Sequence, residues 1–262
     1  MQASESIDKL AAGREHADIK ATLQKVGINV IQTLPPPDCQ DGIYTANWAV
    51  VRGDVAVMAR LPKGREAEIP YAEKVLKDLG KEIITPPDSV YFSGQGDALA
   101  CGELLFANHG YRTDLRMHQF LAETLGYKVI SLQTIPALDP DGKPRVNPIS
   151  GMIDSYFYDL DLALAVLSPD LIAWCPQAFT PESQETLRAL PMEKIEVSFE
   201  EAERHFACNL VSTGETVIMN ADASRLKADI EAKGLKTITP PVKELTKGGG
   251  FVRCVTLTLD NP

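Results

Sequence analysis

The last cysteine of the chain follows three consecutive glycines, in the stretch KGGGFVRCVTLTL from Lys247 to Leu259. A cysteine thiolate is a strong nucleophile, and a bound cation can lower the pKa of a thiol from its free value of about 8.5. Glycine loses more conformational freedom on folding than any other residue, so a triplet indicates a special backbone requirement. Cys254, at the entrance to a strand-like run, is therefore either a nucleophile or a small buried apolar residue.

The composition limits the classes of protein that this chain can belong to. With 262 residues and 44% hydrophobic content, it can bury the core of one large globular domain or two small ones. The net charge of −10 argues against nonspecific nucleic-acid binding and is compatible with a cationic small substrate. We find no apolar run long enough for a membrane span and no signal peptide. Five cysteines without a CxxC pair indicate reduced thiols and a cytoplasmic protein.

The elements that must position Cys254 form an internal repeat. Five segments share a helix end, a short turn that often carries glycine, and a strand-like run: LQKVGINVIQTLPP, LKDLGKEIITPP, AETLGYKVISLQ, RALPMEKIEVS and IEAKGLKTITPP. Glycine after a helix suits a left-handed cap, and the Val, Ile and Thr that follow suit a strand. The sequence therefore predicts five helix–strand units.

Hairpins are predicted between these units. Four of them have turns at Gly53-Asp54, Gly102-Glu103, Pro169-Asp170 and Gly214-Glu215. The C-terminal run FVRCVTLTL is expected to be the second half of a fifth hairpin, whose first half would precede Met1. We therefore predict that an N-terminal strand is missing from the sequence, unless the fold never had one.

The motifs DGIYTANWAVV, FSGQGDAL, GYRTD, YFYDLDLAL, FACNLV and GGGFVRCVTL follow one another in the order and spacing of the pentein superfamily. With its fivefold repeat, essentially the whole chain resembles these guanidino-modifying α/β propellers. They include arginine deiminases, arginine dihydrolases, dimethylarginine hydrolases and amidinotransferases. The resemblance implies that residues 1–262 form a single α/β domain, a five-bladed pseudo-symmetric propeller without its first strand.

The resemblance also implies roles for particular residues. Cys254 would attack the guanidinium carbon, an amine would leave, and a covalent amidino-thioether would be hydrolysed or transferred. The glycines would let the backbone come close to the ligand. Asp161 would bind the guanidinium and Arg112 the substrate carboxylate, because both ions form bidentate pairs. Four further candidates are Asp41 for the α-amino group, Asn47 for the guanidino group, Asp97 as a brace of the loop, and the weaker candidate Asn209.

Two positions depart from the family pattern. Where the family has Tyr-His-Leu-Asp, this chain has aspartate at the histidine position, Asp159, and the glutamate that orients that histidine is Ser93. Histidine is the natural acid and base near neutral pH. Asp159 could act as a general acid if the charge of Asp161 raised its pKa, although a bound guanidinium would oppose that shift.

No histidine of the chain matches the family position. His16, His118 and His205 are not expected to replace the family histidine, and His118 and His205 are expected on helix surfaces. His109 is the one histidine that could take over its role.

The sequence therefore predicts a cysteine-dependent hydrolase of arginine or a methylarginine, with activity impaired at Asp159. Its alternatives are a guanidino-binding protein with little or no activity, an amidinotransferase, and a noncatalytic pentein that binds a macromolecule. The retained nucleophile segment argues against the last of these. We expect no cofactor or metal, a small guanidino compound as partner, no nucleic acid or membrane, and possible self-association.

Overall fold

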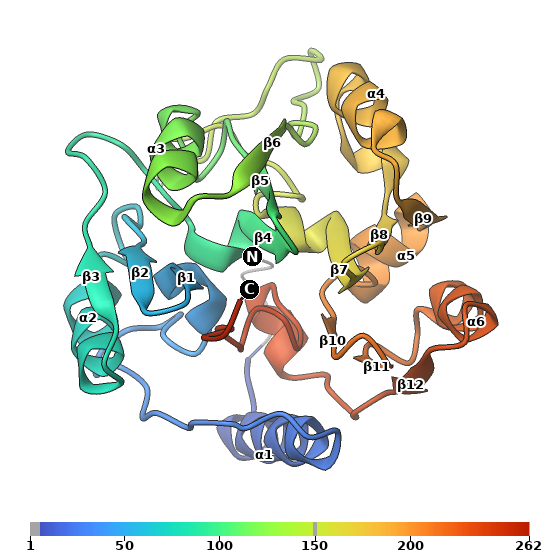
Figure 1. Ribbon diagram of the computed structural model, residues 1–262, viewed down its shortest axis with the longest axis horizontal. Helices are drawn as coiled ribbons and strands as arrows, with labels where there is room; N and C mark the ends of the chain where they lie inside the picture. The colour runs from blue at the N-terminus through green and yellow to red at the C-terminus, as the bar shows by residue number, and fades with distance from the viewer. Residues whose placement is uncertain (1–5, 149–150, 262) are drawn as a thin grey trace.

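The computed structural model describes residues 6–148 and 151–261, and its elements form a ring of similar units (Figure 1). These ranges contain four three-stranded sheets. In each sheet the central strand pairs antiparallel with the strand before it and parallel with the strand after it. The strands are β1 (Ala49–Arg52), β2 (Val55–Met58), β3 (Glu82–Ile84), β4 (Ala98–Cys101), β5 (Leu104–Asn108), β6 (Lys128–Leu132), β7 (Leu164–Ser168), β8 (Leu171–Trp174), β9 (Glu193–Glu196), β10 (Val211–Ser212), β11 (Thr216–Ile218) and β12 (Lys236–Ile238).

The α-helices are α1 (Lys9–Lys25), α2 (Glu68–Asp78), α3 (Arg116–Leu125), α4 (Pro181–Ala189), α5 (Phe199–His205) and α6 (Ser224–Ala232). Five of the helices, α1, α2, α3, α4 and α6, lie on the outside of the ring, and α5 lies further in, beside β8 (Figure 1). The 3-10 helices are η1 (Thr45–Trp48), η2 (Gly94–Gly96), η3 (Leu160–Leu162), η4 (Pro176–Ala178) and η5 (Leu245–Gly248). The described residues include no helix with the length and apolarity needed to cross a membrane.

All four predicted hairpins are confirmed. Their strands meet across the predicted turns, with the pairs Arg52–Val55, Cys101–Leu104, Ser168–Leu171 and Ser212–Val217. Four of the five predicted helix–strand units are also confirmed, because β3, β6, β9 and β12 each follow a helix. Each of these third strands pairs with a central strand, which explains why it is ordered as a strand.

The fifth unit differs from the prediction. Neither residues 28–32, which follow α1, nor residues 250–259 form a strand, and Cys254 lies in a turn. In the other units both outer strands bond to a central one, and the described residues supply no such strand here. A strand is stable only when its backbone groups are paired, so both runs stay irregular. In three of the other units, the first strand of the sheet (β1, β4 or β7) comes just after a 3-10 helix. The C-terminal run comes after a turn in the same way, so its position in the unit is that of a first strand and not of the second half of a hairpin.

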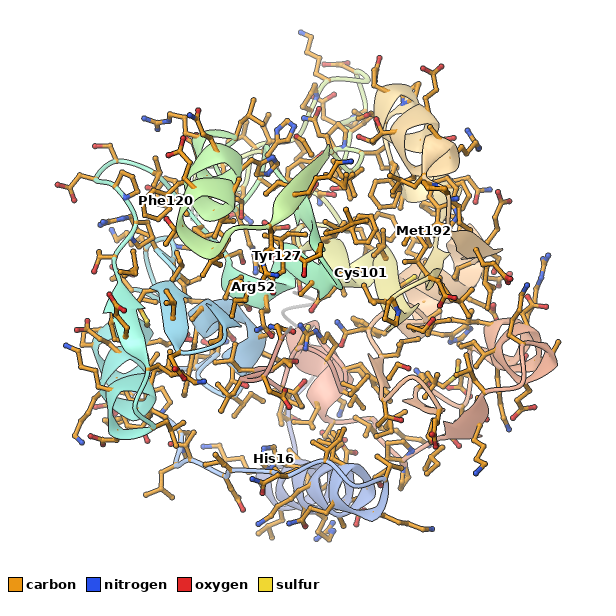
Figure 2. The ribbon with its side chains drawn as sticks, in the orientation of Figure 1. His16, Arg52, Cys101, Phe120, Tyr127 and Met192 are labelled. Atoms are coloured by element: carbon orange, nitrogen blue, oxygen red, sulfur yellow. The ribbon has the colours of Figure 1, made fainter. Side chains whose placement is uncertain are left out.

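Polar side chains tie neighbouring sheets together. The Arg52 guanidinium lies 4.1 Å from the ring centroid of Tyr127 and donates to the Leu125 carbonyl at 3.0 Å, and Figure 2 shows the Arg52–Tyr127 pair between the first two units. Cys101, at the end of β4, donates its thiol hydrogen to the Pro169 carbonyl at 3.4 Å. These contacts fix the first strands relative to one another, and the loops that precede those strands carry the candidate residues.

Candidate active site

Cys254 and Asp161 are in direct contact. The Cys254 thiol lies 3.4 Å from Asp161 Oδ2 and receives a hydrogen bond of 3.0 Å from Asn209 Nδ2. All three residues are buried. The second carboxylate oxygen of Asp161, Oδ1, is buried and has no hydrogen-bond partner among the described residues. A buried carboxylate oxygen without a donor is costly, so this atom is suited to accept from a bound ligand.

Asn209 holds the turn that carries the cysteine. Its Oδ1 accepts hydrogen bonds from the backbone N–H of Phe251 at 2.9 Å and of Cys254 at 3.2 Å. These bonds satisfy backbone donors that no neighbouring strand pairs. Asn209, the weaker candidate in the sequence, therefore contacts the thiol directly and also orients its backbone.

The glycine triplet brings the backbone against the cysteine itself. A Cβ added to Gly250 would lie 2.6 Å from the Cβ and 2.9 Å from the Sγ of Cys254. Such distances are shorter than van der Waals contact, so a side chain at position 250 would push the thiol from its place. The sequence led us to expect close approach to a ligand, whereas the structure shows close approach to the nucleophile.

The charges around the thiol disfavour a thiolate. Burial raises the pKa of Cys254 well above its usual value, and the negative charges of Asp161 and Asp159 raise it further. Burial also raises the pKa of Asp161, as does the charge of Asp159, while Arg253 lowers it. Since negative charge accumulates here in a buried space, a cationic ligand would stabilise both ionised groups.

Asp159 lies on the other side of the site and is fully hydrogen-bonded. Its Oδ1 accepts from Ser93 Oγ at 2.8 Å, and its Oδ2 accepts from Asn47 Nδ2 at 2.8 Å. Arg112 Nη1 lies 3.5 Å from the same Oδ2. The two positions that depart from the expected pattern, 159 and 93, are therefore in direct contact.

Arg112 stacks over Tyr158. Its guanidinium lies 3.8 Å from the ring centroid, and the Tyr158 hydroxyl donates to the Gly249 carbonyl at 2.6 Å. Arg112 keeps about a quarter of its side chain exposed, with a relative accessible surface of 27%. It thus reaches from the surface to Asp159, a position compatible with the carboxylate end of an amino acid.

Asp97 connects the loops around the site. It accepts hydrogen bonds from Asn108 Nδ2 at 3.0 Å, Thr113 Oγ1 at 2.6 Å and the Leu160 backbone at 3.1 Å. Burial raises the pKa of Asp97 to about 7, and the charge of Asp159 contributes, against the lowering effect of the side-chain hydrogen bonds. These contacts join the end of η2, the loop of Arg112 and η3, and the bracing role of Asp97 stays a prediction.

Asp41 and His118 were also singled out in the sequence. The Asp41 carbonyl accepts from Arg65 Nη2 at 3.3 Å, and no hydrogen bond of its carboxylate is seen in the described part of the chain. His118 was expected on the surface of a helix, but it is buried. Its ring nitrogens Nδ1 and Nε2 lie 3.0 Å from Ser131 Oγ and from the Asn108 carbonyl oxygen, respectively, so both are satisfied inside the protein. Within residues 6–148 and 151–261, no group of three His, Cys, Asp or Glu side chains is placed to hold a metal ion.

The sequence analysis missed four residues that support the site. Arg65 and Glu68 form a buried ion pair beside Asn47, and Gln95 and Arg253 bond to each other at 2.9 Å. Gln95 also bonds both backbone groups of Thr258, which fixes the run after Cys254. The spacing of Arg65 and Glu68 at the start of a helix is a weak signal, because such pairs are usually solvated.

Comparison with known proteins relates this geometry to a family. Residues 1–260 match the family model of eukaryotic N,N-dimethylarginine dimethylhydrolase. The dimethylarginine dimethylaminohydrolase of Mycobacterium tuberculosis is 33% identical over 99% of this chain and 79% of its own length. The bifunctional arginine dihydrolase/ornithine cyclodeaminase AgrE of Nostoc is 31% identical over 87% of this chain, but the match spans 30% of that relative.

Solved structures give the same relationship. The N-terminal domain of the cyanobacterial arginine dihydrolase ArgZ, bound to substrate, has 28% identity and a TM-score of 0.84, covering 98% of this chain and 89% of that one. A Pseudomonas aeruginosa dimethylarginine dimethylaminohydrolase with citrulline has a TM-score of 0.77 over 98% of this chain and 92% of its own. Its identity is 19%, so this likeness concerns the fold alone.

Proposed function

The chain belongs to the N,N-dimethylarginine dimethylhydrolase family, and we propose that it is a cysteine-dependent hydrolase of arginine or a methylarginine. The observation that carries this proposal is the pairing of the Cys254 thiol with Asp161, whose second carboxylate oxygen is buried without a donor. A guanidinium would supply N–H donors to that oxygen and positive charge to the thiol. Its carbon would then lie next to the sulfur, where attack is possible.

The proposed reaction begins with ionisation of the thiol when the cation binds. The Cys254 sulfur forms a bond to the guanidinium carbon, and the bond from this carbon to one nitrogen breaks. That nitrogen leaves with a proton as ammonia or methylamine, and an amidino-thioether remains on the sulfur. Water then adds to the carbon, the carbon–sulfur bond breaks, and citrulline and the thiolate form. Both halves require a group that gives and then takes a proton.

A second candidate is a guanidino-binding protein with little turnover. It is favoured by one observation: both oxygens of Asp159, at the family's histidine position, already accept hydrogen bonds from Ser93 and Asn47. Asp161, Arg112 and Cys254 would still bind the ligand, because electrostatic attraction needs no acid or base. Transfer of the amidino group to another amine is less well supported, since it needs the same proton transfers and a second substrate.

We also propose that the chain is one domain, a five-bladed propeller of which the described residues give four complete blades. A central strand placed N-terminal to α1, as in the order of the other units, would pair with residues 28–32 and 256–259. We propose a small guanidino ligand as partner, with self-association possible, and a cytoplasmic location, which the five free cysteines support.

The nucleophile can be tested by labelling. Chloroacetamidine, a cationic mimic of the guanidino group, should alkylate Cys254 faster than the other four cysteines, and L-arginine should slow this reaction. Mass spectrometry of the digested protein gives the rate at each site, and buried Cys208 is the internal control. Equal rates at Cys254 and Cys208, without protection by arginine, would exclude the proposed site.

Turnover is then measured separately by release of ammonia, methylamine and citrulline. Release that depends on Cys254 supports the hydrolase. Arginine-protected labelling without release supports the binding protein.

A further inference from the structure

Arg65 and Glu68 form an ion pair beside the candidate site. Arg65 Nε donates to Glu68 Oε1 at 2.7 Å, and Arg65 Nη2 donates to Glu68 Oε2 at 2.8 Å. The indole N–H of Trp48 donates to the same Oε2 at 3.2 Å. Glu68 is fully buried and Arg65 is 9% exposed. Since a buried ion pair is often no more stable than apolar residues of equal size, stability alone is a weak reason for this pair.

The remaining terminal nitrogen of Arg65 determines how the Asn47 amide is turned. Arg65 Nη1 donates to Asn47 Oδ1 at 2.8 Å. A guanidinium has donors and no acceptor, so only the amide oxygen can face it. The amide nitrogen of Asn47 must therefore point the other way, toward Ser93 and Asp159. The donors of Arg65 therefore fix which end of the Asn47 side chain is Oδ1 and which is Nδ2.

Ser93 continues the same direction of donation. Asn47 Nδ2 lies 2.9 Å from Ser93 Oγ and 3.0 Å from the Ser93 carbonyl oxygen, and the Ser93 hydroxyl donates to Asp159 Oδ1 at 2.8 Å, because a carboxylate can only accept. Asn47 Nδ2 also donates to Asp159 Oδ2 at 2.8 Å. Both oxygens of Asp159 thus receive hydrogen, and Arg65 sets the direction of the donor to Oδ2, so a proton on Oδ2 would face a donor.

We propose that Glu68 and Arg65 act through Asn47 as positioning residues that hold Asp159 as a fixed anion, which transfers no proton. The proposal deepens the proposed function, because it explains how one site could bind a guanidinium and still turn it over poorly. It does not depend on hydrolysis, since the direction of the hydrogen bonds exists in the protein alone.

The pKa of the Cys254 thiol reports the charge of Asp159, because a negative charge on Asp159 helps to raise that pKa. Other groups also act on the two residues. Of these, Arg65 is the one that the double variant below changes, and Asn47→Ala keeps its charge. Those that influence Cys254 or respond to it are Asp161, Arg253, Tyr44, Tyr156 and Tyr158. Those around Asp159 are Asp97, Asp161, Arg65, Arg112 and Tyr158.

The experiment measures the pH dependence of Cys254 alkylation by uncharged iodoacetamide, with mass spectrometry as the readout. Asp159→Asn should shift the profile to lower pH, because one negative charge near the thiol is lost. The double variant Arg65→Met with Glu68→Gln removes the ion pair without changing the net charge. It should shift the profile in the same direction, because a freed Asn47 amide can present its oxygen and let Asp159 keep a proton.

Two combinations separate this role from a merely structural one. In the Asp159→Asn background, the double variant should add no further shift. Arg65→Lys, which keeps a cationic donor for Asn47, should retain the native profile. If the double variant unfolds, Asn47→Ala cuts the same connection without touching the ion pair and should give the same shift.

The proposal is overturned if Asp159→Asn does not shift the pH dependence of Cys254 alkylation. It is also overturned if neither the double variant nor Asn47→Ala shifts it. An equal shift from the double variant with and without Asp159 also overturns it. Because iodoacetamide carries no guanidino group, each of these results is independent of whether the chain hydrolyses arginine.

Discussion

The two halves of the candidate site differ in how their hydrogen-bonding capacity is used. On the nucleophile side, Asp161 contacts the Cys254 thiol and keeps one buried oxygen without a donor. On the side of residue 159, the carboxylate has donors on both oxygens, and the amide of Asn47 is bonded at both ends. The first half therefore keeps one hydrogen-bond acceptor unused. The second half is satisfied by the protein itself.

This difference separates binding from proton transfer. A site that binds a guanidinium needs acceptors and negative charge, which the nucleophile side retains. A site that hydrolyses it also needs a group that exchanges a proton near neutral pH, and a carboxylate held by two donors is poorly suited to that. Substitutions confined to one side should therefore affect binding and turnover differently.

The largest effect is expected from restoring the family pattern at residues 159 and 93. Asp159→His with Ser93→Glu places an imidazole and its carboxylate partner where two side chains already touch. General acid and base catalysis is typically worth about 10² to 10⁴ in rate, so ammonia or methylamine release should rise by about that factor.

Each single substitution at these positions should give much less, because the two residues act as a unit. An unmodified chain with full activity that survives Asp159→Ala would show that another group carries the proton.

Asp161→Asn tests the nucleophile side and should change two measurements in opposite directions. The thiol pKa should fall, since the charge of Asp161 helps to raise it, so alkylation by iodoacetamide at neutral pH should become faster. Protection by L-arginine should weaken about tenfold or more, because a charged hydrogen bond contributes roughly 1.5 to 3 kcal/mol.

Asp170→Asn, in the exposed turn between β7 and β8, is the matched control and should change neither measurement. Slower alkylation in Asp161→Asn would instead assign Asp161 the role of the thiol's base.

Features of the fold and the site that depend on neighbouring residues could be predicted from the sequence, whereas features that depend on distant residues could not. The hairpin turns and the glycine after α3 were predictable because their signals are local, and Gly126 indeed has φ of 72°. Cys254, Asp161 and Arg112 could be nominated from motif order, and the structure brings Cys254 to Asp161 and Arg112 to Asp159.

Other features depend on distant partners. Residues 256–259 form no strand, and the described residues supply no central strand for them to pair with, whereas the local pattern of this run predicted a strand. The burial of Arg65 and Glu68 is likewise set by tertiary packing around Trp48. The direction of the Asn47 amide then follows from that burial, so the sequence could suggest Asn47 as a guanidino ligand but not show that its amide is already engaged.

Two glycines allow the same substitution to be made on each side. A Cβ at Gly250 would lie 2.9 Å from the Cys254 sulfur. One at Gly96 would meet Asn47 Nδ2 first and would lie 2.7 Å from Asp159 Oδ2. Gly250→Ala should slow chloroacetamidine labelling about tenfold, since such overpacking costs about 1 to 3 kcal/mol. Gly96→Ala should leave the labelling rate closer to native and mainly shift its pH profile, because it disturbs the contact with Asp159. Equal effects on both measurements would mean that the two sides are not separable.

The smallest effect concerns stability against pH. In the folded protein, burial and the charge of Asp159 raise the pKa of Asp97 to about 7, against an ordinary value of 3.8. Between these values the folded state holds a proton that the unfolded state has released, so stability falls as pH rises from about 4 to about 7 and then levels. Asp161, raised in the same way, acts in the same direction. Asp114, lowered to about 2, loses its contribution only below about pH 4, outside this window.

Asp159→Asn should reduce this loss, because it removes a charge that raises the pKa of both Asp97 and Asp161. Each unit by which the Asp97 pKa falls adds about 1.4 kcal/mol of stability on the alkaline side of the window. Urea unfolding at about pH 5 and about pH 8 measures this, and the variant should gain on the native chain at the higher pH. Asp141→Asn, on an exposed loop, should run parallel to the native chain. Parallel profiles for Asp159→Asn as well would show that Asp159 carries little charge in the folded protein, which would remove the contrast between the two sides of the site.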